Sequence, residues 1–284
     1  MFKPFSLNIR GRLIEYDRPA VMGIINVTPD SFYAGSRIKS DEMGGRVRAM
    51  IADGADMIDI GAYSSRPGAS AVSEAEELDR LAEGMATLRE AAPDVIVSVD
   101  TFRAGVAKAA IEQFGADIIN DISGGDLDSN MFATVASLNV PYILMHMRGT
   151  PVEMQTLTDY PDGVTAEVLK DLSNKVRRLR LAGVNDVIVD PGFGFAKTLE
   201  QNYRLMTDLP LFGLLFDAPI LVGISRKSMI TRALGVSAQD ALNGTTVLNT
   251  IALLNGAQIL RVHDVKACSE AVKIVSLLPP QPSI

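Results

Sequence analysis

The sequence is poor in the residues that cross-link proteins covalently or through metals. Its 284 residues include one Cys, Cys268, and two His. A single thiol cannot form an internal disulfide, and Cys and His together are too few for a structural zinc site. Because disulfides are rare in reducing compartments, this composition predicts a cytoplasmic location.

Long apolar runs are also absent. The N-terminal segment MFKPFSLNIRGR lacks the continuous apolar core of a signal peptide. The longest uncharged stretch, residues 241–260, contains Asn, Thr, Gly and Gln side chains that make it too polar for a transmembrane helix. We therefore expect no membrane partner, and we interpret this stretch as a buried helix leading into a strand.

Basic side chains are neither in excess nor gathered in blocks. The chain has 27 Lys and Arg against 34 Asp and Glu, which gives a net charge of -7. A nucleic-acid-binding surface needs a basic patch or stripe. We therefore expect no nucleic-acid partner, and any anionic ligand has to be met by local positive charges.

Most generic catalytic motifs are missing. The segment GFGFAK, residues 192–197, lacks the third glycine of a dinucleotide-binding fingerprint. The chain has no Walker A sequence, no HExxH and no GxSxG elbow. Ser-His-Asp catalysis stays open as an alternative, but no elbow marks a serine for it.

Short runs rich in Val, Ile and Leu alternate with segments that have helical spacing. Near-continuous apolar strands that alternate with helices indicate a parallel sheet covered by helices. Eight such units favour a closed (β/α)₈ TIM barrel, with an open doubly wound sheet as the alternative. The eight runs are residues 20–25, 56–60, 95–99, 117–119, 141–145, 186–189, 219–224 and 257–262.

The intervening segments predict helices, and the N-terminus predicts a hairpin. Residues 6–16, with Arg10 and Gly11 at their centre, resemble a β-hairpin placed before the barrel and closing its lower end. No linker-like stretch divides the chain, so we expect one domain over residues 1–284, with the hairpin in 1–18 and the barrel in 19–280. The predicted helices include residues 41–53, 73–92, 103–114, 163–182, 199–209, 226–234 and 244–255.

Each apolar run is followed by a polar side chain. In a barrel of this kind the carboxyl ends of the strands form the active face. Asp, Asn and Ser also follow strands because they start turns and cap helices, and this structural interpretation explains Asp121, Asp264 and His146. It explains the whole set of strand-end residues less well, because charged side chains at strand ends need partners. The strand-end residues are Asn26, Ser64, Ser65, Arg66, Asp100, Asn120, Asp121, His146, Asp190, Ser225, Arg226, Lys227, Ser228, Arg261, His263 and Asp264.

These strand-end residues fall into two groups. Asp100, Asn120 and Asp190 offer acceptors and one amide to a ring that bears several N–H groups. Lys227, Arg261 and His263 follow the last two strands, where such barrels frequently hold phosphate. The two groups together predict a nitrogen-rich ring that carries a phosphate.

Eight stretches of this sequence resemble dihydropteroate synthases, the folate-pathway family that joins a pterin to 4-aminobenzoate. They follow the family's order and span residues 22 to 264. The stretches are MGIINVTPDSFY (22–33), SRPG (65–68), SVDT (98–101), IND (119–121), LMHMR (144–148), DPGFGFAK (190–197), GISRKS (223–228) and RVHD (261–264).

The resemblance implies a Mg²⁺-assisted ionising loss of diphosphate and a site assembled from small-molecule subsites. Catalytic roles would belong to Asp100, Lys227, Asn26 and Arg66, and Mg²⁺ would bind Asn26. The pterin would contact Asp100, Asn120, Asp190, Lys227, Met145, Phe195 and Gly223. The diphosphate would contact Asn26, Ser65, Arg261 and His263, and 4-aminobenzoate would contact Arg66, Pro67, Phe32, Phe195, Lys227 and Ser228. The family resemblance also suggests a homodimer formed through barrel helices.

The sequence departs from the family pattern at a few loop positions. Ser65 stands where the family has Thr, and Tyr63 stands where an acidic residue is frequent. Tyr33, Ala34 and Gly35 replace a more polar stretch. Two alternatives stay open: the pterin-binding domain of a corrinoid-dependent methyltransferase, and an inactive paralogue that binds a partner. The SRKS and RVHD motifs argue against the first, because a methyl carrier needs no diphosphate site.

Overall fold

Eight parallel strands close into a barrel, which confirms the predicted (β/α)₈ architecture. The fold is known from a computed structural model that describes residues 2–27, 37–63 and 72–279. The strands pair in the order β8-β7-β6-β5-β4-β3-β10-β9, and a bridge between Val189 and Ile220 joins the two ends of this order. An open doubly wound sheet would leave those ends apart. The barrel strands are β3 (Ala20–Asn26), β4 (Met57–Gly61), β5 (Ile96–Asp100), β6 (Ile118–Asp121), β7 (Tyr142–Met145), β8 (Val187–Asp190), β9 (Leu221–Val222) and β10 (Ile259–Val262).

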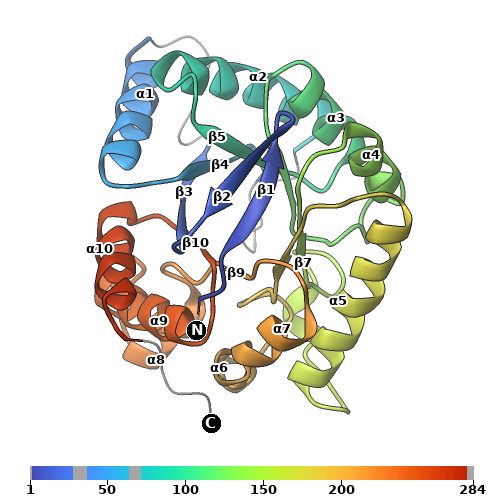
Figure 1. The fold of residues 1–284 in the computed structure, drawn as a ribbon, viewed down its shortest axis with the longest axis vertical. Coiled ribbons are helices and arrows are strands. Elements are labelled where there is room, and N and C mark those ends of the chain that lie inside the picture. Colours follow the sequence, from blue (N-terminus) through green and yellow to red (C-terminus); the bar gives the residue numbers. More distant parts are fainter. Residues whose placement is uncertain (1, 28–36, 64–71, 280–284) are drawn as a thin grey trace.

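Helices surround the barrel on all sides (Figure 1). Ser73 and Thr198 cap two of them by accepting hydrogen bonds from the backbone N–H groups of Glu76 and Gln201. Three helices were not among those predicted: α4, α7 and α10. The helices are α1 (Arg37–Ala52), α2 (Glu74–Ala91), α3 (Ala104–Glu112), α4 (Met131–Leu138), α5 (Val164–Leu181), α6 (Leu199–Thr207), α7 (Leu209–Leu215), α8 (Ser228–Leu234), α9 (Leu242–Leu254) and α10 (Val265–Ser276), with a 3-10 turn at Met154–Thr156.

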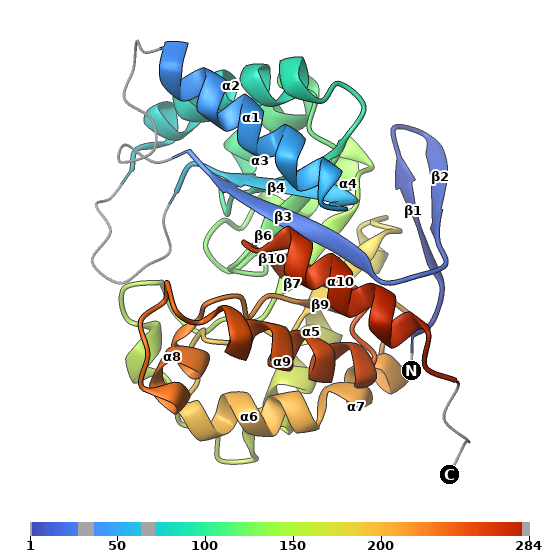
Figure 2. The same ribbon diagram turned by 90° about the vertical axis from the view of Figure 1, so that its left-hand side faces the viewer.

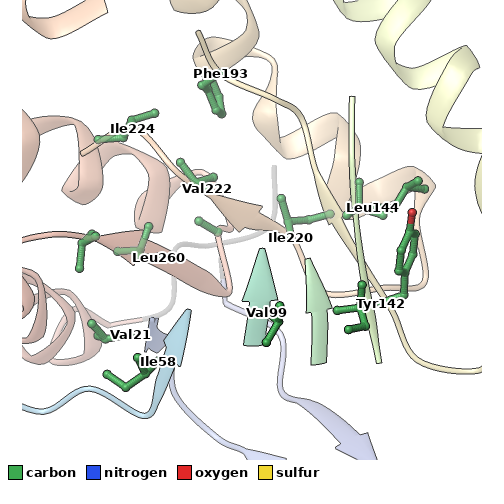
Figure 3. Packing of buried hydrophobic residues seen from close by; sticks show 14 of the residues in the cluster. Val21, Ile58, Val99, Tyr142, Leu144, Phe193, Ile220, Val222, Ile224 and Leu260 are labelled. Atoms are coloured by element: carbon green, nitrogen blue, oxygen red, sulfur yellow. The ribbon is translucent and has the colours of Figure 1, made fainter. Parts of the chain in front are cut away.

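Alternate residues of each strand point outward and pack under the helices. Successive side chains of a strand face opposite sides, so one set meets the helices and the other fills the barrel. Figure 3 shows members of the outer set, among them Val99 of β5, Leu144 of β7 and Val222 of β9. All three are fully buried. This outer layer explains why the strands read as nearly continuous apolar runs.

The lower half of the barrel interior is apolar and is covered by the predicted hairpin. Strands β1 (Phe5–Ile9) and β2 (Arg12–Tyr16) pair in antiparallel fashion, with Arg10 and Gly11 in the left-handed conformation of a tight hairpin turn. Figure 2 shows the hairpin at the end of the barrel where β3 begins. Its inner side chains join one buried cluster with residues from the starts of the barrel strands; the cluster contains Leu7, Ile9, Tyr16, Ala20, Met22, Met57, Ile118, Ile143, Ile188, Leu221 and Ile259.

The upper half of the barrel interior is polar. Side chains of a strand alternate between its two faces, so the residue two positions after each member of the apolar layer also points into the barrel. At those positions Met57 of β4 is followed by Asp59, and Ile259 of β10 is followed by Arg261. The same step brings Asn120, Met145, Asp190 and Gly223 to this level from β6, β7, β8 and the end of β9. An apolar layer thus supports a polar one along the barrel axis.

Candidate active site

Arg261 lies at the centre of the polar layer and bridges two carboxylates. Its Nε donates to Oδ2 of Asp59 at 2.7 Å, and its Nη2 lies 2.6 Å from the same oxygen. Nη2 also donates to Oδ2 of Asp100 at 2.8 Å. The amide nitrogen of Asn120 faces the Asp59 oxygens at 3.3 and 3.2 Å. Three strands that are distant in the sequence, β4, β5 and β10, are therefore joined through one guanidinium.

The electrostatics of this cluster follow from burial. Burial raises the pKa of Asp100 to about 7, against the opposing effect of Arg261, and the nearby Asp59 raises it further. Burial alone would lower the pKa of Arg261, but Asp59 and Asp100 outweigh it and raise that pKa. Arg261 is therefore a permanent cation, whereas burial favours the neutral form of Asp100 more than that of an exposed carboxyl.

Asp190 at the end of β8 and Lys227 at the start of α8 influence each other through their charges. Burial raises the pKa of Asp190, while Lys227 opposes that rise, and the backbone N–H of Gly192 donates to Asp190 at 2.8 Å. Burial also lowers the pKa of Lys227 to about 8, although Asp190 favours its charged form. Lys227 Nζ donates to the Phe193 carbonyl at 2.7 Å and lies 4.6 Å from the ring centre of Phe195.

Gly223 lies beside both cations. A side-chain carbon at this position would lie 4.0 Å from Lys227 Nζ and 3.8 Å from Arg261 Cβ. The backbone of β9 therefore approaches the space between Arg261 and Lys227. Contact between a flat ring and Gly223 stays a prediction.

The loop after β8 is held by a buried amine, that of Lys197, to which the sequence analysis gave no role. Lys197 Nζ donates to the carbonyl oxygens of Gly192 at 2.9 Å and Phe195 at 3.0 Å, and it lies 3.0 Å from His146 Nδ1. Burial, followed by the charge of Lys197, lowers the pKa of His146 well below its usual value. The lowered pKa favours neutral His146, whose Nδ1 can accept from Lys197. Burial also lowers the pKa of Lys197, to about 7.

An apolar wall adjoins this loop. Met145 and Phe195, which are expected to pack against a ring, belong to one cluster. A methionine and aromatic surface suits the face of a flat heterocycle. The cluster consists of Ile122, Met145, Met147, Met154 and Ala196, with Phe102, Leu127 and Phe195 packed against it.

The remaining candidate residues are distributed as follows. Asn26 ends β3 and is half-buried, and Ser228 is the exposed first residue of α8. His263 is half-buried beyond β10, where its backbone N–H donates to Ser225 Oγ at 3.2 Å. The other expected contacts, Phe32, Ser65, Arg66 and Pro67, lie outside the described residues. Within the described ranges, no group of three or more Asp, Glu, His or Cys side chains could hold a metal ion.

The structure corrects one interpretation and confirms another. Arg261 does not belong to a separate cationic group, because it is ion-paired with Asp59 and Asp100 inside the acceptor-rich group. Asp121 caps a turn through Ser123 and accepts from the Tyr142 hydroxyl, and Asp264 pairs with Arg226 at 2.7 Å. Asp121 therefore starts a turn, as the structural interpretation predicts, whereas Asp264 makes no capping hydrogen bond and serves the ion pair with Arg226.

Asp59 is the site residue that the sequence reasoning missed. It lies inside the apolar run 56–60 rather than after it, so a search of strand ends passes over it. The signal was present: a carboxylate two residues after Met57 has to face the interior of the barrel. A fully buried carboxylate needs a cation or strong donors, and Arg261 and Asn120 supply them.

Comparison with known proteins links this geometry to pterin chemistry. The family model described as "Pterin binding enzyme" matches residues 22–263. The chain is 40% identical over 273 residues to a dihydropteroate synthase of Streptococcus pyogenes, covering 94% of this chain and 98% of that protein. It spans 48% of the length of the mitochondrial folate synthesis bifunctional protein of Arabidopsis thaliana, to which it is 43% identical.

Solved structures give the same result. The dihydropteroate synthase of Yersinia pestis in a sulfonamide drug complex superimposes with a TM-score of 0.87 and 40% identity, over 96% of this chain and 98% of that chain. The dihydropteroate synthase of Xanthomonas albilineans with 4-aminobenzoic acid gives a TM-score of 0.86 and 36% identity, over 96% and 98% of the two chains.

Proposed function

This chain belongs to the dihydropteroate synthase family of pterin-binding enzymes, and we propose that it condenses 6-hydroxymethyl-7,8-dihydropterin diphosphate with 4-aminobenzoate. The products would be 7,8-dihydropteroate and diphosphate. The observation that carries the proposal is the polar layer itself, in which Arg261 joins Asp59 and Asp100 beside Asn120. The membership makes the protein a transferase.

Ring recognition would use the acceptor-rich part of this layer. A pterin carries several ring and exocyclic N–H groups, and the side chains of Asp100, Asn120 and Asp190 can accept from them. Met145 and Phe195 would contact the ring faces from the apolar wall. Lys227 would donate to a ring acceptor, since its Nζ already lies beside Gly223 and Phe195.

The chemical step would be an ionisation followed by capture. The bond between the pterin methylene carbon and the diphosphate oxygen breaks, and its electron pair leaves with the diphosphate. Arg261, His263 and Lys227 would take up that charge, and the Asp100 carboxylate would stabilise the cationic pterin. The aniline nitrogen of 4-aminobenzoate then attacks the methylene carbon and loses one proton. Because the aniline is a weak nucleophile, a path with prior bond breaking is favoured.

The proposed Mg²⁺ fits the donor set in a limited way. Asn26 offers one amide oxygen at the end of β3, and the described residues form no carboxylate or histidine cluster that could cage an ion. Mg²⁺ commonly keeps several waters and binds through substrate phosphates. It would thus be held by Asn26 and diphosphate oxygens, and when bound it offsets negative charge on the leaving group.

The 4-aminobenzoate subsite and the assembly state are also proposals. Lys227 and Ser228 would meet the carboxylate of 4-aminobenzoate, with Phe195 against its ring.

A homodimer is supported by an apolar face on α9, where Val247, Ile251 and Leu254 are 51, 37 and 47% exposed at helical spacing. The helices of the described residues include none that is long and apolar enough to cross a membrane. The buried free thiol of Cys268 suits the predicted cytoplasmic location.

One assay tests the proposed reaction. Purified protein, Mg²⁺ and the pterin diphosphate are incubated with and without 4-aminobenzoate, and diphosphate release and dihydropteroate are measured. Release that depends on 4-aminobenzoate, with dihydropteroate formed, is expected. Pterin binding without any release would overturn the proposal and favour the methyl-carrier or inactive-paralogue alternative.

A further inference from the structure

Asp59 is fully buried on the inner face of β4 and is surrounded by donors. It accepts from Arg261 and from the side-chain amide of Asn120. We propose that Asp59 is a positioning residue that fixes the Asn120 amide so that its carbonyl oxygen, and not its NH₂ group, meets the pterin ring. This inference rests on the proposed function and deepens it.

The two ends of the Asn120 side-chain amide differ in hydrogen bonding. The NH₂ group only donates and the carbonyl oxygen only accepts, while their shapes are nearly the same. A carboxylate can only accept, so Asp59 selects the orientation in which Asn120 turns its NH₂ group inward. Within the described part of the chain, no hydrogen bond ends on Asn120 Oδ1. That oxygen is therefore available to a ring N–H.

The reverse orientation is unfavourable for a clear reason. It would place Asn120 Oδ1 against the Asp59 carboxylate, so that two acceptors would face one another without a hydrogen between them. A buried acceptor that loses its donor is costly. The Arg261 guanidinium lies 2.6 Å from Asp59 Oδ2 and holds this carboxylate in place through an ion pair. The ion pair between Arg261 and Asp59 thus keeps the Asn120 amide in one orientation. Asp59 itself does not need to touch the ligand.

A purely structural ion pair is the competing explanation, and Asp117 provides a matched control. The side chains of Asp59 and Asp117 are both 0% exposed, and both pair with arginine. Asp117 lies just before β6, where it pairs with Arg10 and Arg89 and accepts from the Val97 backbone N–H. It is at the hairpin end of the barrel, away from the polar layer. Replacing it removes a buried carboxylate without changing Asn120.

The test compares Asp59→Asn with Asp117→Asn. Calorimetry with 6-hydroxymethyl-7,8-dihydropterin diphosphate, without 4-aminobenzoate, gives the Kd, and thermal unfolding gives Tm. An asparagine at position 59 can donate to a flipped Asn120, so the selection is lost. We expect Asp59→Asn to weaken pterin binding about 10- to 100-fold, while Asp117→Asn lowers Tm and leaves Kd unchanged. The KM for 4-aminobenzoate should change little in either variant.

Asn120→Ala separates the proposed route from a general loss of affinity. If Asp59 acts through Asn120, the variant that combines Asp59→Asn with Asn120→Ala loses less pterin affinity than the product of the two single losses. Fully multiplicative losses would overturn the inference. The inference would also be overturned if the wild-type protein binds the pterin diphosphate and Asp59→Asn binds it with the same Kd. Failure of the wild-type protein to bind the pterin diphosphate would overturn the proposed function, and the inference with it.

A measurement on the wild-type protein keeps the inference testable if Asp59→Asn does not fold. The side-chain NH₂ signals of Asn120 are assigned by comparison with Asn120→Ala in ¹⁵N-labelled protein. They should be protected from exchange without ligand and should stay protected and little shifted when pterin diphosphate binds. Exposed signals in the free protein, or a large shift on binding, would show that the NH₂ group meets the ligand and would overturn the inference.

Discussion

At the scale of single residues, the site depends on carboxylates whose protonation is set by their surroundings. Asp100 illustrates this, because burial raises its pKa to about 7. In the proposed mechanism only the carboxylate form stabilises a cationic pterin. The value of kcat/KM, which reports the free enzyme, should therefore rise as the pH increases through about 7. A pH profile of the wild-type protein measures this rise.

The variant Asp100→Asn tests the same residue. Asparagine keeps the shape and loses the charge, so we expect kcat to fall about 100-fold, as for other lost electrostatic contacts to a developing charge. The rise near pH 7 should vanish as well. Near-normal turnover with unchanged affinity would show that the charge of Asp100 has no catalytic role.

Lys197 gives a second prediction at this scale. In Lys197→Met the carbonyls of Gly192 and Phe195 and the Nδ1 of His146 lose their common donor. We expect the free energy of unfolding to fall by about 2 to 4 kcal/mol, because buried acceptors are left unpaired. Pterin affinity should fall too, since the same loop carries Phe193, whose carbonyl holds Lys227. Denaturant titration and calorimetry measure the two effects.

How much of the site could be predicted also depends on single residues. Asp100, Asn120 and Asp190 were recognisable because they end apolar runs. Asp59 was not, since it interrupts a run, and its role depends on Arg261 from a strand about two hundred residues later. Long-range pairing of this kind is decided by packing and cannot be read from local sequence.

At the scale of secondary-structure elements, the hairpin β1–β2 has a structural role that can be tested separately. Leu7 is 1% exposed and packs into the lower barrel layer, whereas Leu13 on the same hairpin is 65% exposed. Leu7→Ala should lower the free energy of unfolding by about 2 to 5 kcal/mol. Leu13→Ala should have little effect. Neither change should alter KM, and a shift in KM would mean that the hairpin influences the site.

Regular apolar spacing accounts for most of the elements that the sequence predicts. The strand runs and the long helices were found to within a few residues, because their apolar spacing is regular. Helix α7, with sequence LPLFGLL, is apolar on every side and too short to show a helical period. Helix α10 does show that period at Val265, Cys268 and Val272, which is sufficient to predict it from the sequence.

At the scale of the whole molecule, the exposed face of α9 predicts assembly. Replacing Val247 and Ile251 together by Glu places charges on the proposed dimer surface, and the product should be a monomer by light scattering. Leu181→Glu is the matched control, because Leu181 at the end of α5 is 79% exposed and lies off that face. A dimer that survives the paired change would show that α9 is not the interface.

The closed lower end of the barrel has a consequence for the traffic of ligands. Because the hairpin and the apolar layer fill that end, both substrates and both products have to pass the carboxyl ends of the strands. The pterin, which would lie deepest, against Asn120 and Asp190, would have to arrive first and leave last. Binding should therefore be ordered, and dihydropteroate should compete with the pterin substrate for the same route.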